Sequence, residues 1–254
     1  CGYGTLARIG GGDLRALFGF LVLGIAAYMA IAGPTAQLRL YVLSPLAFGS
    51  SSAPNTFLQV AAIGPLTSIL LPLAIAVGLG AWSLNHSTFR KSTRHVFWGS
   101  AVGIAILSGW LATGWLGADP FEPQPVVSHT FSVPLGQTLI FFMTMSSATV
   151  SFGIGGTLGV ILGAFVGALI KKEFRWEGAD DAREMRRHLV GAFLMGTGGV
   201  YAGGCTIGQG LSAASVLAIS APVVLASIWC GVWLGLNYMM EGSVVGGFRA
   251  LMNR

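Results

Sequence analysis

The stretch VYAGGCTIGQGLSAASVLAISAP, from Val200 to Pro222, decides how this chain is organised. It lies inside an uncharged run from Leu189 to Met240, which is more than twice the roughly 20 residues that one helical membrane crossing needs. Glycines surround Cys205 near the centre of this run, and serines follow it. We therefore expect a helix broken near Cys205 and enclosed by protein or a wet cavity, because non-helical backbone is not tolerated against lipid.

The composition of the whole chain is that of a membrane protein. Hydrophobic residues make up 54% of the 254 residues and charged residues only 9%, against roughly 25% in an ordinary soluble domain. The 38 glycines suit close helix packing and interrupted helices. The 14 basic residues gather in short patches between apolar runs, which is typical of cytoplasmic loops. The lipid bilayer is therefore an expected partner, and nucleic acid is not.

The apolar runs and charged loops predict a multi-pass topology. Basic loops at 85–95 and 171–188 are expected to be cytoplasmic, and the loop 117–135, which has acidic but no basic residues, is expected outside. The uncharged stretch before residue 170 is too long for one crossing, so we expect a short re-entrant element from Gln137 to about Ser147. The expected full crossings are Leu14–Gly33, Leu66–Leu84, Val96–Leu116, Ser151–Ile170 and Ile219–Met240.

A short motif occurs twice in the chain. CGYGTL at residues 1–6 resembles CTIGQGL at 205–211, since each has Cys-x-x-Gly followed by leucine. Each copy precedes a short linker and a full crossing, and the two crossings run in opposite directions. Inverted repeats with interrupted helices are a transporter plan, in which helix N-termini direct backbone N–H groups at an anion. The prediction is an all-α polytopic membrane protein with one transmembrane transport domain over residues 1–254.

The two motifs supply the candidate substrate-binding residues. Glycine lets the backbone approach a solute closely, while hydroxyl and amide side chains offer neutral donors. An apolar setting favours the neutral thiol of Cys205, whose polarizable sulfur and weak S–H donor suit a sulfur-containing anion. The candidates are Cys1, Gly2, Tyr3, Gly4, Thr5, Gly204, Cys205, Thr206, Gly208, Gln209 and Ser212.

Four segments resemble one known family. They are CGYGTLARIGGGDLRAL at the start, TVSFGIGG at 149–156, FRWEG at 174–178 and GGCTIGQGLS at 203–212, and they are similar to the YeeE/YedE family of bacterial membrane proteins. That family is associated with uptake of thiosulfate and related sulfur species.

The resemblance implies an all-helical hourglass in the bacterial inner membrane. Short helices would enter it from both faces, and cysteines would line the substrate path, a role that falls on Cys1 and Cys205. A further family cysteine would lie upstream of Cys1, so the N-terminal part of the family domain is expected to be absent from this sequence. The expected partners are a small sulfur anion and, as a candidate, a cytoplasmic sulfur-carrier protein.

Three functions of different classes are compatible with these residues. The first is uptake of a small sulfur anion, with thiosulfate favoured and sulfite, sulfide and selenium species open. The second is a membrane thiol enzyme that relays persulfide, and the third is a non-transporting subunit of a larger membrane complex. The chain has no C-x-x-C pair and no recognisable cofactor motif, so we expect neither an enzyme nor a bound cofactor.

Other reactive residues receive simpler interpretations. Cys230 lies among aromatic residues in IWCGVW and is expected to serve packing. The four histidines fall in or beside loops, so no metal site is expected; they are His86, His95, His129 and His188. The segment GLSAAS has no histidine in a predicted crossing to act as its base, which speaks against an intramembrane serine protease.

Overall fold

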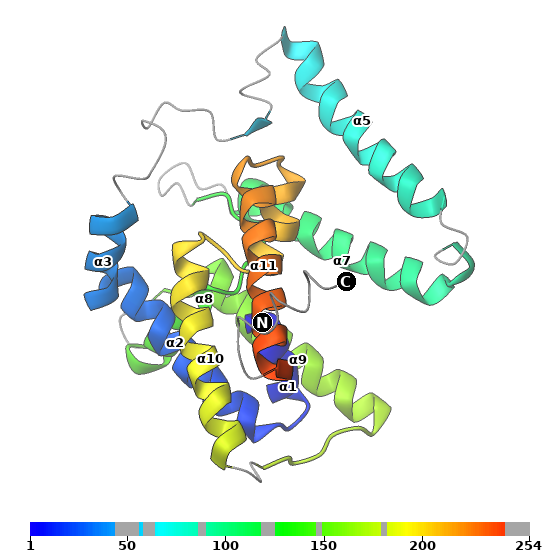
Figure 1. The fold of residues 1–254 in the computed structure, drawn as a ribbon. Helices are drawn as coiled ribbons and strands as arrows, with labels where there is room; N and C mark the ends of the chain where they lie inside the picture. The colour runs from blue at the N-terminus through cyan, green and yellow to red at the C-terminus, as the bar shows by residue number, and fades with distance from the viewer. Residues whose placement is uncertain are drawn as a thin grey trace.

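A computed structural model describes most of the chain as helices (Figure 1). The described residues are 1–43, 56–57, 64–85, 90–117, 125–145, 149–178 and 182–241. Their helices are α1 (Gly2–Gly10), α2 (Leu14–Ala32), α3 (Pro34–Leu43), α5 (Gly64–Asn85), α7 (Thr93–Leu111), α8 (Val133–Met143), α9 (Phe152–Lys171), α10 (Ala182–Tyr201) and α11 (Ser220–Glu241). Two π-helical segments accompany them, η1 (Ala112–Leu116) and η2 (Gly208–Ala213). The predicted all-α class is confirmed.

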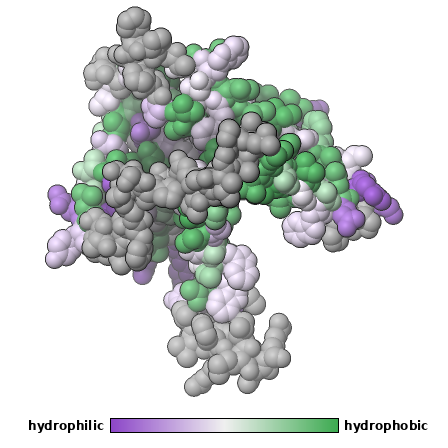
Figure 2. Space-filling view, turned by 90° about the horizontal axis from the view of Figure 1, so that it is seen from above, coloured by the Kyte–Doolittle hydropathy of each residue, from purple (hydrophilic) through white to green (hydrophobic). Residues whose placement is uncertain are grey.

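Four of the described helices are long and apolar enough to cross a bilayer. They are Leu14–Ala32, Thr93–Leu116, Phe152–Lys171 and Ser220–Met239, and they match four of the predicted crossings closely. Helix α5 coincides with the fifth, and its apolar stretch is described from Leu70 to Asn85. Hydrophobic residues cover the part of the surface in Figure 2 that corresponds to α5 and α7 in Figure 1. The chain is therefore a multi-pass membrane protein.

Helices α2 and α10 pack side by side and run in the same direction (Figure 1). Near the start of both helices, Gly19 lies against the imidazole of His188. Further along, Gly196 faces Leu23, and a Cβ atom at Gly196 would lie 2.5 Å from the carbonyl oxygen of Leu23. Only glycine allows this approach, so Gly196 determines how closely the two helices pack.

The beginning of α2 is held by polar contacts to α1 and to the segment that precedes α10. Asp13 caps α2 by accepting a hydrogen bond from the backbone N–H of Arg15 at 2.9 Å, and it pairs with Arg8 at 2.5 Å. The backbone N–H of Leu14 donates to the carbonyl of Glu177 at 3.0 Å. The N-terminal segment and the FRWEG segment, far apart in sequence, therefore lie side by side.

The predicted cytoplasmic loop 171–188 is shorter than expected. Its last part forms the first two turns of α10, which begins at Ala182. These turns are polar and mostly exposed, so they lack the hydrophobic periodicity that would have marked them as helix. The prediction of a loop there was wrong for residues 182–188.

The segment 125–132 is extended and lies against α7. The hydroxyl of Thr113 donates to the carbonyl of Val127 at 2.6 Å, and the hydroxyl of Ser128 donates to the carbonyl of Ile106 at 2.8 Å. Ile106 lies near the middle of the α7 crossing. The prediction that all of 117–135 is an outside loop was therefore wrong for its last part, since the chain returns into the protein there. Residues 118–124 lie outside the described residues.

The predicted re-entrant element is present as helix α8, but it is displaced. It covers Val133–Met143 instead of Gln137 to about Ser147, a residue outside the described part of the chain. Ser132 occupies its N-cap position and Pro134 lies in its first turn, where a proline is compatible with a helix start. Helix α8 therefore begins earlier in the sequence than the start that the length of the uncharged stretch predicted.

Candidate functional site

Helix α10 is ended by the glycines that precede Cys205. The backbone of Gly203 is left-handed, with φ of 71°, and its N–H donates to the carbonyl of Val200 at 3.1 Å. The N–H of Gly204 donates to the carbonyl of Gly199 at 2.9 Å. This pair of hydrogen bonds is the Schellman motif, which needs a left-handed residue and favours glycine there. The predicted break near Cys205 is confirmed.

Both cysteines of the repeated motif accept a helical hydrogen bond from the residue four places later. The carbonyl of Cys1 accepts from the N–H of Thr5 in α1 at 2.9 Å. The carbonyl of Cys205 accepts from the N–H of Gln209 at 2.8 Å, at the start of the helix that contains η2. The N–H of Gly208 points at the Cys205 sulfur, 3.4 Å away. The likeness between the two motifs in sequence is thus a likeness in local structure.

Two helix N-termini meet at one cavity of about 690 Å³, which we call the central cavity, and Cys1 lines it beside them. Ser132 begins α8, and Cys205 begins the short helix that contains η2. No charged side chain is among the described residues that line the central cavity. Its lining consists of Cys1, Gly2, Leu23, Phe131, Ser132, Gly191, Leu194, Met195, Gly198, Gly199, Ala202, Gly204, Cys205, Thr206, Ser227, Ile228, Gly231 and Val232. Any positive potential there comes from backbone N–H groups and helix dipoles.

The central cavity lies at mid-depth in the helix bundle. Leu23 is at the middle of α2, and Gly231 is close to the middle of α11. Both helices are candidate membrane crossings, so their midpoints lie near the bilayer midplane. This is where interrupted helices bind solutes in transporters built from inverted repeats.

The structure divides the candidate residues into three groups. Five of them line the central cavity: Cys1, Gly2, Gly204, Cys205 and Thr206. Thr5 lines an adjoining cavity that also contains Cys1. The remaining candidates line neither cavity; they are Tyr3, Gly4, Gly208, Gln209 and Ser212.

The side chain of Gln209 forms hydrogen bonds across the helix break near Cys205. Its side-chain amide donates to the carbonyls of Ala202 and Gly203 at 3.3 and 3.2 Å, and its amide oxygen accepts from the hydroxyl of Ser220 at 3.1 Å. These contacts satisfy carbonyls that the end of α10 leaves without helical partners. Gln209 therefore does not line the central cavity, but it stabilises the backbone that does.

Ser212 and Gly208 hold the short helix against the extended segment. The hydroxyl of Ser212 donates to the carbonyl of His129 at 2.6 Å. Gly208 lies against Thr130, and a Cβ atom at Gly208 would come within 2.5 Å of the Thr130 hydroxyl oxygen. The close approach at Gly208 is therefore to the side chain of Thr130 in the segment 125–132.

Sequence reasoning missed Ser132 and the glycine face of α10. Ser132 precedes Val-Pro, a pattern that signals a helix start and could have been noticed. Gly191, Gly198 and Gly199 recur at helical spacing, which places them on one face of α10. A Cβ atom at Gly199 would lie 2.7 Å from the Ser132 hydroxyl oxygen, so this glycine leaves room for the start of α8.

Cys230 lies outside the candidate site. It is exposed on α11 and lines neither cavity, although its neighbours Ile228 and Gly231 line the central cavity. Its exposure means that it does not pack within the described part of the chain, so the expected packing role stays a prediction.

Comparisons with known proteins agree with this architecture. A family model described as sulphur transport matches residues 1–234. The thiosulfate transporter TsuA of Escherichia coli K12 is 33% identical over 109 residues, which are 43% of this chain and 28% of that protein. The thiosulfate transporter TsuA of Spirochaeta thermophila is 26% identical over 250 residues, covering 92% of this chain and 72% of that protein. These are transporters and not enzymes, and the chain belongs to the sulphur transport (YeeE/YedE) family that its motifs resembled.

Proposed function

We propose that this protein takes up thiosulfate across the bacterial inner membrane through the central cavity, between Cys1 and Cys205. The observation that carries the proposal is the meeting of both cysteines with two helix N-termini in one cavity at mid-depth. Family membership and the names of the two relatives support a sulfur anion as the solute. A cytoplasmic sulfur-carrier protein is the partner we propose to receive the ion.

The helix N-termini explain how an anion is held without a fixed cation. Each helix start carries roughly half a positive charge and several N–H groups without helical partners. In the central cavity these groups belong to the turns that follow Ser132 and Cys205. A dianion meets partial charges there and not a full ion pair, so it is attracted and still released.

The Cys205 thiol supplies selectivity for sulfur. Because the N–H of Gly208 lies 3.4 Å from its sulfur, that sulfur already accepts a hydrogen bond on the protein side. The thiol hydrogen is then free to turn toward the cavity and donate to the terminal sulfur of thiosulfate. A neutral, polarizable thiol favours this atom over an oxygen without repelling the ion.

Uptake of radiolabelled thiosulfate into vesicles tests the proposal. Wild type is compared with Cys205→Ser and Cys205→Ala at matched membrane levels, with excess sulfate as competitor. Cys230→Ser is the matched control, since Cys230 is a cysteine that lines neither cavity. We expect wild type above Ser, Ser at or above Ala, no effect of Cys230→Ser, and weak competition by sulfate. Full uptake by Cys205→Ala would show that the cysteine is packing and that the site is wrong.

A further inference from the structure

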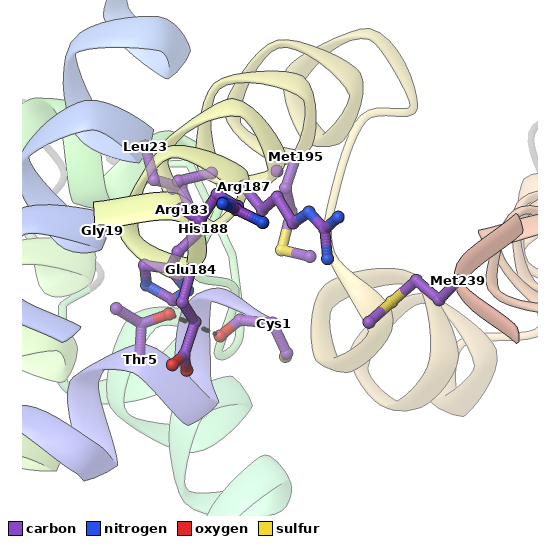
Figure 3. A pocket seen from close by; sticks show the side chains of 12 residues that line it. Cys1, Thr5, Gly19, Leu23, Arg183, Glu184, Arg187, His188, Met195 and Met239 are labelled. Atoms are coloured by element: carbon purple, nitrogen blue, oxygen red, sulfur yellow. Dashed lines mark hydrogen bonds between the residues drawn. The ribbon is translucent and has the colours of Figure 1, made fainter. Parts of the chain in front are cut away.

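A second cavity, of about 650 Å³, adjoins the central cavity (Figure 3). It lies along α10 between α1, α2 and the end of α11. Four residues line both cavities: Cys1, Leu23, Gly191 and Met195. The two spaces are therefore neighbours, and Cys1 stands at their boundary. We call this second space the vestibule.

The vestibule lies toward one face of the membrane. It is lined by Gly19 in the first half of α2, by the first turns of α10 and by Met239 at the end of α11. The central cavity is lined by the middles of the same helices. The vestibule thus separates the mid-depth site from the face at which the basic segment 171–188 predicts the cytoplasm.

The vestibule differs from the central cavity in its charge. Arg183 and Arg187 project from α10 into the space that Met239 faces from α11 (Figure 3). The acidic lining residue, Glu184, forms an ion pair with Arg15 at 3.3 Å. Arg187 is therefore the basic lining residue on which an anion site can rest. Two further acidic residues precede α10 at 180 and 181 and lie outside the described part of the chain.

We propose that the vestibule is a second anion subsite, in which Arg187 holds the transported ion between the central cavity and the cytoplasm. The inference rests on the proposed function and assigns two of its steps, general anion binding and selection for sulfur, to two different cavities. A guanidinium recognises an anion through charge and through N–H bonds to oxygen. Thiosulfate and sulfate both offer these oxygens, so the vestibule binds either ion. Selection for sulfur belongs to Cys205.

Equilibrium binding of labelled sulfate to the purified protein with its full chain tests the subsite. Arg187→Gln is compared with Arg186→Gln, because Arg186 is the neighbouring exposed arginine on α10 and lines neither cavity. At about 0.01 M salt, removing one charge roughly 6 Å from a divalent anion should raise the dissociation constant about threefold to tenfold. Arg186→Gln should leave it unchanged. Arg187→Gln should weaken thiosulfate binding by the same factor as sulfate binding.

Phospholipid headgroups carry anionic oxygens of the same kind, so a second experiment distinguishes binding of lipid from binding of the transported ion. Uptake is measured in vesicles of phosphatidylcholine alone and in vesicles that also contain phosphatidylglycerol. An Arg187→Gln defect in both supports a site for the transported ion. A defect confined to vesicles with phosphatidylglycerol would assign Arg187 to lipid and overturn the inference, as would equal sulfate binding by Arg187→Gln and Arg186→Gln. Failure of the proposed function would appear separately, as no thiosulfate uptake by wild type.

Discussion

Gly208→Ala is the substitution that best tests how the short helix after Cys205 is seated. The added Cβ atom would lie 2.5 Å from the hydroxyl oxygen of Thr130 and 3.0 Å from its Cβ atom. Carbon atoms in contact normally sit about 3.5–4.0 Å apart, so the two segments must separate by about 1 Å. Because the N–H of Gly208 donates to the sulfur of Cys205 within the same short helix, this shift also moves the thiol relative to the central cavity.

The size of the effect follows from overpacking. Extra atoms in a packed site cost about 1–3 kcal/mol, partly offset by the better helix propensity of alanine. Each 1.4 kcal/mol changes an equilibrium constant about tenfold, so the equilibrium between the native and the displaced arrangement should shift about fivefold or more toward the displaced one. We expect thiosulfate uptake by Gly208→Ala to fall at matched membrane levels, by up to about that factor.

Two comparisons make the Gly208 result specific. Gly163→Ala in α9 is the matched control, because nothing lies within 4 Å of a Cβ atom at that helical glycine. Adding Thr130→Ala to Gly208→Ala removes the nearest clashing atom and should restore part of the uptake. The reasoning is refuted if Gly208→Ala transports like wild type, or if the double variant is no better than the single one.

Two other predictions concern stability and topology. Lys172 ends α9 in a left-handed conformation with φ of 55°, so Lys172→Gly should stabilise the protein by about 1 kcal/mol in thermal unfolding in detergent, whereas Lys171→Gly inside the helix should destabilise it. Opposite effects of this kind are required, and equal melting temperatures would contradict the left-handed assignment. Single cysteines at His95 and Asp119, in a background without other cysteines, should react with a membrane-impermeant thiol reagent from opposite sides of the membrane. Labelling of both from one side would end the topology.

The long crossings and the break were predictable because their signals are local. Uninterrupted apolar runs mark α2, α7, α9 and α11, and their observed ends follow the runs closely. The glycine pair before Cys205 marks the break, since a left-handed residue is needed at the end of α10. Gly204 and Thr206, which flank Cys205 and line the central cavity, were predicted because they belong to the same local motif.

The rest depends on contacts between distant residues, which no local pattern reveals. The parallel packing of α2 on α10 rests on the approach of Gly196 to Leu23, which are far apart in the chain. The return of residues 125–132 into the protein rests on hydroxyl groups of other segments. Gln209 and Ser212 were assigned to the solute because they are polar, but the structure shows them bonded to backbone carbonyls. Polarity alone does not distinguish these two uses.

The extended segment also constrains which positions can vary over evolution. Val127 and His129 are held through their backbone carbonyls, which every amino acid possesses. The donors are the hydroxyls of Thr113 and Ser212, in η1 and η2, and replacing either by an aliphatic residue would leave a carbonyl without its partner at a cost of about 1–3 kcal/mol. The residues whose identity this segment constrains therefore lie in two π-helical turns elsewhere in the chain. Divergent relatives should keep serine or threonine at 113 and 212 even where residue 127 has drifted.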